Sequence, residues 1–171
     1  VSVGLMVGLA SEAALASTAS AASQILSEAP GLNANVLSLG LDAYLYAKKH
    51  GVAVKKSLLT IVDYSLPSSQ KRLWVIDLKT GQVLNTLLVA QGKNTGYTQA
   101  KYFSNEDSSL KSSIGVFLTG DQYYGKHGKS MRLNGLDKGY NDHARQRGIV
   151  VHAASYVTEA YVQAHGRVGN S

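Results

Sequence analysis

Imidazole is the side chain of this 171-residue chain with the clearest potential for acid–base chemistry, since the chain contains five histidines and no cysteine. His152 stands out because it ends the apolar run Ile149–Val151, where a predicted strand gives way to a loop. Such a position exposes a side chain at the end of a sheet while its backbone stays rigid, as a catalytic group requires. The local pattern leaves a second interpretation open, a core histidine whose hydrogen bonds are satisfied.

The other histidines are weaker candidates. His50 falls in the last turn of a predicted helix, where a cation interacts favourably with the helix dipole, and His143 lies in a polar turn and is read as a surface residue. His127, His152 and His165 could in principle form a three-histidine metal site, but no His-Glu-x-x-His or other short paired spacing accompanies them. We therefore expect neither a metal site nor a cofactor.

No residue presents itself as a nucleophile for His152. Serines are plentiful, so a Ser-His-Asp arrangement is conceivable, yet no Gly-x-Ser-x-Gly elbow singles one out. The glycine-rich motifs that hold phosphates are absent as well. Without cysteine, disulfides and cysteine-based metal sites are excluded for these residues.

The charge balance suits a polyanionic partner, and surface charge that serves only solubility is the alternative. A formal charge of +6 favours nucleic acid, an anionic membrane or an acidic cell-wall polymer over a neutral partner. No run of Lys and Arg exceeds two residues, and no nucleic-acid-binding signature adjoins those pairs. We expect no nucleic-acid partner.

Residues 1–55 are predicted to form a helical N-terminal segment that packs on the rest of the chain. One helix has Ser11 as its N-cap and stops at Pro30, and a second ends at Gly51, a residue type suited to the left-handed position after a helix. The apolar face of the second helix comprises Leu37, Leu41, Tyr44 and Leu45.

The opening stretch, VSVGLMVGLASEAALASTASAAS, combines an apolar decamer with small residues. It resembles the tail of a secretory signal with an Ala-x-Ala site, and an ordinary alanine-rich helix is the alternative. The apolar run is far too short to span a bilayer, so no transmembrane segment is predicted.

From residue 58 the hydrophobic pattern changes to short strand-like runs, which predicts a β-rich α+β fold. A turn carrying Gly81 joins two of the runs into a hairpin. The polar, glycine-rich stretches 91–111 and 121–131 are predicted to be binding loops, and a late helix is predicted from Tyr156 to His165. The strand-like runs cover residues 58–64, 72–78, 82–90, 112–120, 132–136 and 148–153.

Several of these stretches together resemble a known family. They are VDYSLPSSQKRLWVIDLKTGQVL, VAQGKNTG, FSNEDSSLKSSIGVFLTG, YYGKHGKSMRLNGL, NDHARQRGIVVHA and HGRVGNS, in that order. Over about residues 58–171 the chain looks like the murein L,D-transpeptidase catalytic domain of the YkuD-like group, and the first 50 residues lie outside the resemblance. The resemblance implies a catalytic domain over residues 56–171 with a mixed-sheet or sandwich core. It also implies peptidoglycan stem peptides as partners, and a place in the periplasm or cell envelope.

In this family a histidine at a strand end precedes a Ser-x-Gly-Cys motif. By this resemblance His152 is the general base and Ser171 is the serine of the motif, so the cysteine nucleophile is expected beyond the chain, and the 171 residues alone are expected to be inactive. The imidazole would draw a proton from the thiol, and the thiolate would attack the carbonyl between the L- and D-centres of a stem tetrapeptide. D-Ala would leave, and an amine from a neighbouring stem would resolve the thioester.

The resemblance also suggests residues that would line the cleft. Tyr124, His127 and Arg132 are expected there as substrate-binding residues, with a structural role in a long loop as the alternative. Arg132 could hold a stem-peptide carboxylate in bidentate fashion. Arg167 is expected to bind substrate or, with Asn170, to shape the loop that positions the cysteine.

One departure from the family pattern concerns the base itself. Many relatives place Gly or Ser directly after the base histidine, whereas this chain has Ala153, so a backbone carbonyl would have to hold the tautomer of His152. Two other functions remain open at this point, a catalytically inactive peptidoglycan-binding module and a hydrolytic L,D-peptidase.

Overall fold

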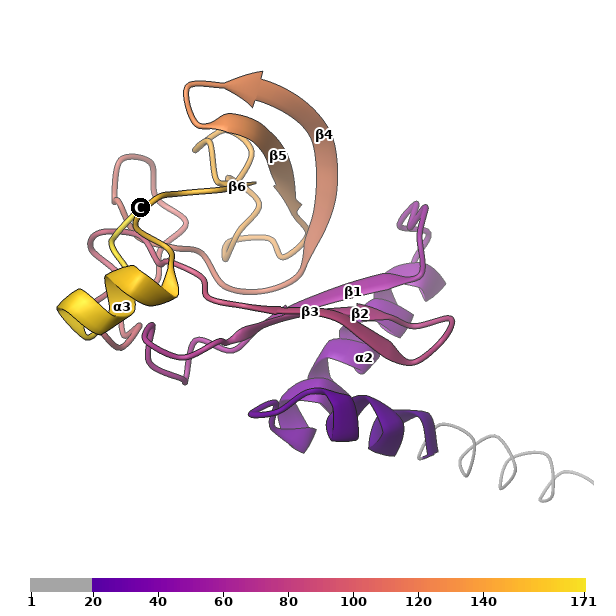
Figure 1. Cartoon of the computed structure of the whole chain (residues 1–171). Coiled ribbons are helices and arrows are strands. Elements are labelled where there is room, and N and C mark those ends of the chain that lie inside the picture. The colour runs from indigo at the N-terminus through magenta and orange to yellow at the C-terminus, as the bar shows by residue number, and fades with distance from the viewer. Residues whose placement is uncertain (1–19) are drawn as a thin grey trace, which may run out of the picture. The chain divides into compact units, whose positions relative to one another are not determined.

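The computed structural model describes residues 20–171, and the predicted helix cap at Ser11 and most of the signal-like stretch lie outside these residues. The described chain forms two compact units (Figure 1). One takes in residues up to Ile61 together with Trp74–Thr86, and the other comprises Val62–Leu73 and Leu87–Ser171. The division into residues 1–55 and 56–171 stays a prediction.

Helices begin the first unit. Residues 20–28 are helical, and α2 follows over Ala34–Lys49. The side chain of Asn33 caps α2 by accepting a hydrogen bond from the amide of Asn35, and Gly51 adopts a φ of 80° just after the helix. The predicted end of the helix is therefore confirmed.

The buried face of α2 differs from the predicted one. Leu37 is buried, whereas Leu45 is 59% exposed. A Cβ atom on Gly40 would lie 2.9 Å from the Cδ1 atom of Ile61, so the small residue lets the helix approach strand β1 closely. Close approach is possible only through small side chains, and Gly40 and Ala47 therefore define the contact face in place of the bulkier leucine.

A three-stranded sheet completes this unit, with strands β1 (Leu58–Val62), β2 (Leu73–Asp77) and β3 (Gln82–Leu87) in the order β1-β2-β3. Trp74 and Ile76 on the central strand are both fully buried, as expected for residues two apart that point to the same face. Gly81 has a φ of 75° in the turn between β2 and β3, which confirms the predicted hairpin.

The second unit contains an antiparallel sheet of strands β4 (Phe117–Gly125), β5 (Gly128–Gly135) and β6 (Val150–His152), in the order β4-β5-β6. Figure 1 shows β4 and β5 as a long curved hairpin with β6 beside β5. The prediction of a loop over residues 121–131 is wrong, because most of that stretch is paired strand. Its glycines, Gly125 and Gly128, end β4 and begin β5, and they flank the tight turn.

The late helix, α3, spans Glu159–His165 and is shorter than predicted. The hydroxyl of Thr158 accepts a hydrogen bond from the amide of Tyr161 and so caps the helix, while Tyr156 lies in the preceding turn. The presence of the helix is confirmed, as is the β-rich α+β class of the fold.

Two arginines, Arg72 and Arg147, hold the long loops of the second unit. Arg72 is fully buried and donates to the carbonyls of Leu66 and Val89 and to the side-chain oxygen of Gln91. Burial lowers the pKa of the Arg72 guanidinium, because desolvation penalises the charged form. Loops cannot pair all their carbonyls within regular structure, so a buried multidentate donor supplies the partners.

Arg147 stabilises the loop over residues 104–113 in the same way, through hydrogen bonds. Its guanidinium donates to the carbonyls of Ser104 and Lys111 and to the hydroxyls of Ser109 and Ser113, at 2.5–2.9 Å. Residues 91–111 thus form a loop, as predicted, and Arg147 joins the end of this loop to the segment between β5 and β6.

No helix within residues 20–171 is long and apolar enough to cross a bilayer.

Candidate functional site

The strand register places His152 in a row of three residues on one face of the β4-β5-β6 sheet. His152 lies opposite Ser130 on β5, and Ser130 lies opposite Tyr123 on β4. Directly paired residues of antiparallel strands project from the same face. Arg132 lies two residues along β5 from Ser130, opposite Val150, and therefore shares this face as the diagonal neighbour of His152.

The imidazole of His152 is oriented by the backbone. Its Nδ1 lies 2.8 Å from the carbonyl oxygen of Ala153. Because a carbonyl can only accept, Nδ1 carries the hydrogen, and Nε2 of the neutral ring keeps its lone pair free to accept a proton. The carbonyl of Ala153 is therefore the backbone acceptor that was expected to hold the tautomer of His152.

His127 from the turn between β4 and β5 stacks on His152. The ring centroids are 4.5 Å apart and the ring planes differ by 21°. His127 was expected in the cleft on other grounds, and the structure brings it directly against His152.

Arg132 lies in a small network of charged and polar groups. Its Nε is 3.2 Å from a carboxylate oxygen of Asp121, and its guanidinium carbon is 4.4 Å from the ring centroid of Tyr123. Arg145 donates to the other oxygen of Asp121 at 2.9 Å and to the side-chain oxygen of Asn134 at 3.1 Å. The hydrogen bond from Arg145 is the main cause that holds the pKa of Asp121 below its ordinary value.

The sequence did not single out Tyr123, Asp121 or Arg145. Strand alternation would have placed Tyr123 with His152, had residues 121–131 been read as a hairpin. By the same alternation Tyr124, opposite Lys129, projects from the other face of the sheet, and it is 84% exposed.

The loop that follows α3 is folded against the same unit. The guanidinium carbon of Arg167 lies 3.8 Å from the ring centroid of Tyr97, and its Nη1 donates to the carbonyl of Val168 and to the side-chain oxygen of Asn170. Val168 is buried. Two of these contacts lie within the loop of Arg167, and the third joins this loop to the one that carries Tyr97.

Ser171 is held through its backbone. Its amide donates to the carbonyl of Gln91 at 3.1 Å, and its carbonyl accepts from the amide of Lys93 at 2.9 Å. Gly169 donates to the carbonyl of Tyr156, and a Cβ atom at Gly169 would lie 2.6 Å from the Cβ of Tyr156. The segment from α3 to Ser171 is therefore closely docked.

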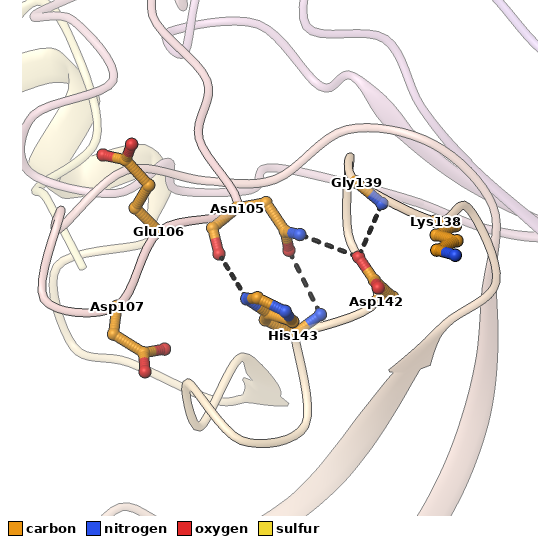
Figure 2. A pocket seen from close by; sticks show the side chains of 7 residues that line it. All are labelled: Asn105, Glu106, Asp107, Lys138, Gly139, Asp142 and His143. Carbon is orange, nitrogen blue, oxygen red and sulfur yellow. Dashed lines mark hydrogen bonds between the residues drawn. The ribbon is translucent and has the colours of Figure 1, made fainter.

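An open pocket of about 510 Å³ lies elsewhere on this unit (Figure 2). Figure 2 shows its polar groups bonded to one another: Asn105 donates to Asp142, and His143 bonds to Asn105 through both its backbone amide and its ring. The hydrogen bond from the amide of Gly139 is the main cause that lowers the pKa of Asp142. The lining of the pocket comprises Asn105, Glu106, Asp107, Lys138, Gly139, Asp142 and His143.

None of the predicted site residues lines this pocket, and its polar groups mainly support the loops that carry them. Within residues 20–171 no group of three His, Asp or Glu side chains could hold a metal ion.

Comparison with known families identifies the class of protein to which the chain belongs. The model of the L,D-transpeptidase catalytic domain matches residues 28–171, and the chain belongs to this family of peptidoglycan enzymes. The match includes α2 and so begins well before residue 58, where the resemblance was expected to start. No curated protein and no solved structure matches the chain.

Proposed function

We propose that this protein is a peptidoglycan L,D-transpeptidase in which His152 is the general base. The observation that carries the proposal is the orientation of the imidazole: Nδ1 donates to the carbonyl of Ala153, which leaves Nε2 as the acceptor at the end of β6. Membership of the family supplies the reaction class. We place the protein in the periplasm or cell envelope, where peptidoglycan is found.

The nucleophile of the proposed reaction is a cysteine three positions after Ser171. Nε2 of His152 takes the thiol proton, and the thiolate adds to the carbonyl between the L- and D-centres of a stem tetrapeptide. The bond to D-Ala breaks as the imidazolium returns the proton to the departing amine, and a thioester remains. An acceptor amine then attacks the thioester, gives a proton to His152 and releases the cysteine.

Arg132 is the group that we propose for substrate recognition. Asp121 and the ring of Tyr123 hold its Nε edge and one face. Among residues 20–171 no hydrogen-bond partner occupies its two terminal amino groups, which form a fork suited to a carboxylate. Diagonal neighbours across paired strands lie roughly 7–8 Å apart at Cα, so a carboxylate near the scissile carbonyl is within reach of both Arg132 and His152.

Arg167 has a different role in this proposal. Its contacts with Tyr97, Val168 and Asn170 favour the shaping of the loop over direct binding of substrate. Tyr124 projects from the face opposite His152 and receives no role in binding the stem peptide.

The first experiment reads the gene beyond Ser171 and follows thioester formation in the encoded protein by mass spectrometry. A sequence x-Gly-Cys and an adduct that is lost in His152→Gln are the expected results, and acylation that persists in His152→Gln would remove His152 from the role of base. A codon other than cysteine at that position would favour the inactive peptidoglycan-binding module.

A second experiment distinguishes transfer from hydrolysis. The protein is incubated with a disaccharide-tetrapeptide, and the products are identified by mass spectrometry. Cross-linked dimers are expected of a transpeptidase, whereas tripeptide alone would identify the hydrolytic L,D-peptidase.

A further inference from the structure

The turn between β4 and β5 carries the residue that contacts the face of His152. Lys126 and His127 form the tip of the hairpin, and Gly128 next to them has a φ of 75°. His127 lies in an exposed turn, yet its ring is stacked at 4.5 Å on the imidazole of a different strand. Ordering an exposed side chain costs conformational entropy, which the ring contact offsets.

Two contacts are needed to fix an imidazole that has two rotatable bonds. The hydrogen bond from Nδ1 of His152 to Ala153 directs one edge of the ring, but the plane can still tilt about that bond. The flat contact with His127 restricts this tilt. Together they determine where the lone pair on Nε2 points.

No other side chain within residues 20–171 forms a hydrogen bond to this ring. Ser130, directly opposite His152, is buried and donates its hydroxyl to the carbonyl of Gly128. Tyr123, next in the row, lies against Arg132. Among the described side chains, His127 is the one whose ring is stacked on that of His152.

We propose that His127 is a positioning residue that holds the plane of the His152 imidazole. The catalytic role of His127 rests on the proposed function, whereas its ring contact with His152 can be tested in the 171-residue chain. A flat ring is what the position requires, so phenylalanine should replace His127 and alanine should not. A direct role of His127 on the substrate predicts instead that both variants fail, since phenylalanine and alanine both lack the ring nitrogens.

The first test measures the ring resonances of His152 by NMR in the 171-residue chain. A stacked ring shifts the protons of its neighbour upfield, so His127→Ala should move the His152 ring protons downfield and increase the mobility of the ring, and His127→Phe should keep both close to the parent values. The matched control is Tyr124→Ala, three residues away and on the opposite face of the sheet, which should leave His152 unchanged. Identical His152 spectra in His127→Ala and the parent chain would overturn the proposal.

The second test measures thioester formation in the protein that carries the nucleophile. Misplacement of a catalytic group by a fraction of an ångström to one ångström costs up to about 100-fold in rate, so His127→Ala should slow acylation roughly 10- to 100-fold with little change in KM, and His127→Phe should restore most of the rate. Equal loss in both variants would overturn the positioning role. Full acylation in His152→Gln would instead contradict the proposed function and would leave the NMR result valid.

Discussion

Arg132 lies over the ring of Tyr123, with its guanidinium carbon 4.4 Å from the ring centroid. The next residue, Tyr124, points away from this face and is exposed. Two adjacent tyrosines on β4 therefore have unequal parts in the site, and one of them supports the arginine that we propose for carboxylate recognition. Four predictions follow from the contacts of this unit.

Removal of the supporting ring should weaken binding of the stem peptide. A cation–π contact at a partly exposed site contributes about 0.5–1 kcal/mol, so Tyr123→Leu should weaken binding of a stem tetrapeptide about two- to fivefold. Isothermal titration calorimetry with the free tetrapeptide measures the change. Tyr124→Leu is the matched control and should bind as the parent chain does; equal losses in both variants would show that the ring contact is not what matters.

The fork of Arg132 should recognise a free carboxylate. Arg132→Gln should weaken tetrapeptide binding about 10- to 100-fold, since charge-assisted hydrogen bonds contribute roughly 1.5–3 kcal/mol. Amidation of the C-terminal carboxylate should weaken binding to the parent chain by a similar factor. If the two losses add in full when combined, Arg132 and that carboxylate do not interact, because interacting partners are non-additive.

The two arginines of the loop after β5 should differ sharply in their effect on stability. Arg147 makes four hydrogen bonds in a partly buried site, whereas Arg145 contacts Asp121 and Asn134 at the surface. Arg147→Ala should lower the free energy of unfolding by roughly 3 kcal/mol because it removes the donor from partly buried acceptors, and Arg145→Ala by less than about 1 kcal/mol. Urea unfolding measures the stability of both variants. Similar losses of stability would show that the hydrogen bonds of Arg147 do not hold the loop.

Asp121 should link stability to pH in the acid range. Its pKa in the folded chain is below its ordinary value of 3.8, chiefly because of the hydrogen bond from Arg145, so the ionised form is favoured by folding. Its contribution is therefore complete above that value and is lost as the pH falls through the lower folded value. The urea midpoints of the parent chain and Asp121→Asn should differ by a constant amount above about pH 5 and converge in acid. High salt should reduce the difference, because the carboxylate is exposed; a gap that widened in acid would contradict this linkage.

The sequence allowed the main elements to be predicted where the signal is local. The end of α2 at Gly51, the hairpin at Gly81 and the strand that ends at His152 each follow from a few adjacent residues. The hairpin of β4 and β5 was missed, since its glycines and lysines are also typical of a loop. Because the hairpin was missed, the strand alternation that places Tyr123 and Tyr124 on opposite faces of the sheet was missed as well.

The partners of Arg72 and Arg147 could not be predicted at all. Arg147 reaches back to Ser104 and Ser113, and Arg72 reaches forward to Gln91, so these contacts depend on the finished path of the chain. An arginine in a polar stretch is normally solvated, and no local pattern distinguishes one that closes a loop. The stack of His127 on His152 is hidden for the same reason.

The backbone pairing of Ser171 with Gln91 and Lys93 sets a limit on reach. An extended chain advances at most about 3.6 Å per residue, so a residue three positions later must lie within about 11 Å of this anchored point. A reactive group on so short a segment samples a small volume, so the loss of conformational entropy on bringing it to the imidazole is correspondingly small. In the proposed function, these two backbone hydrogen bonds would therefore restrict the volume that the cysteine nucleophile can sample.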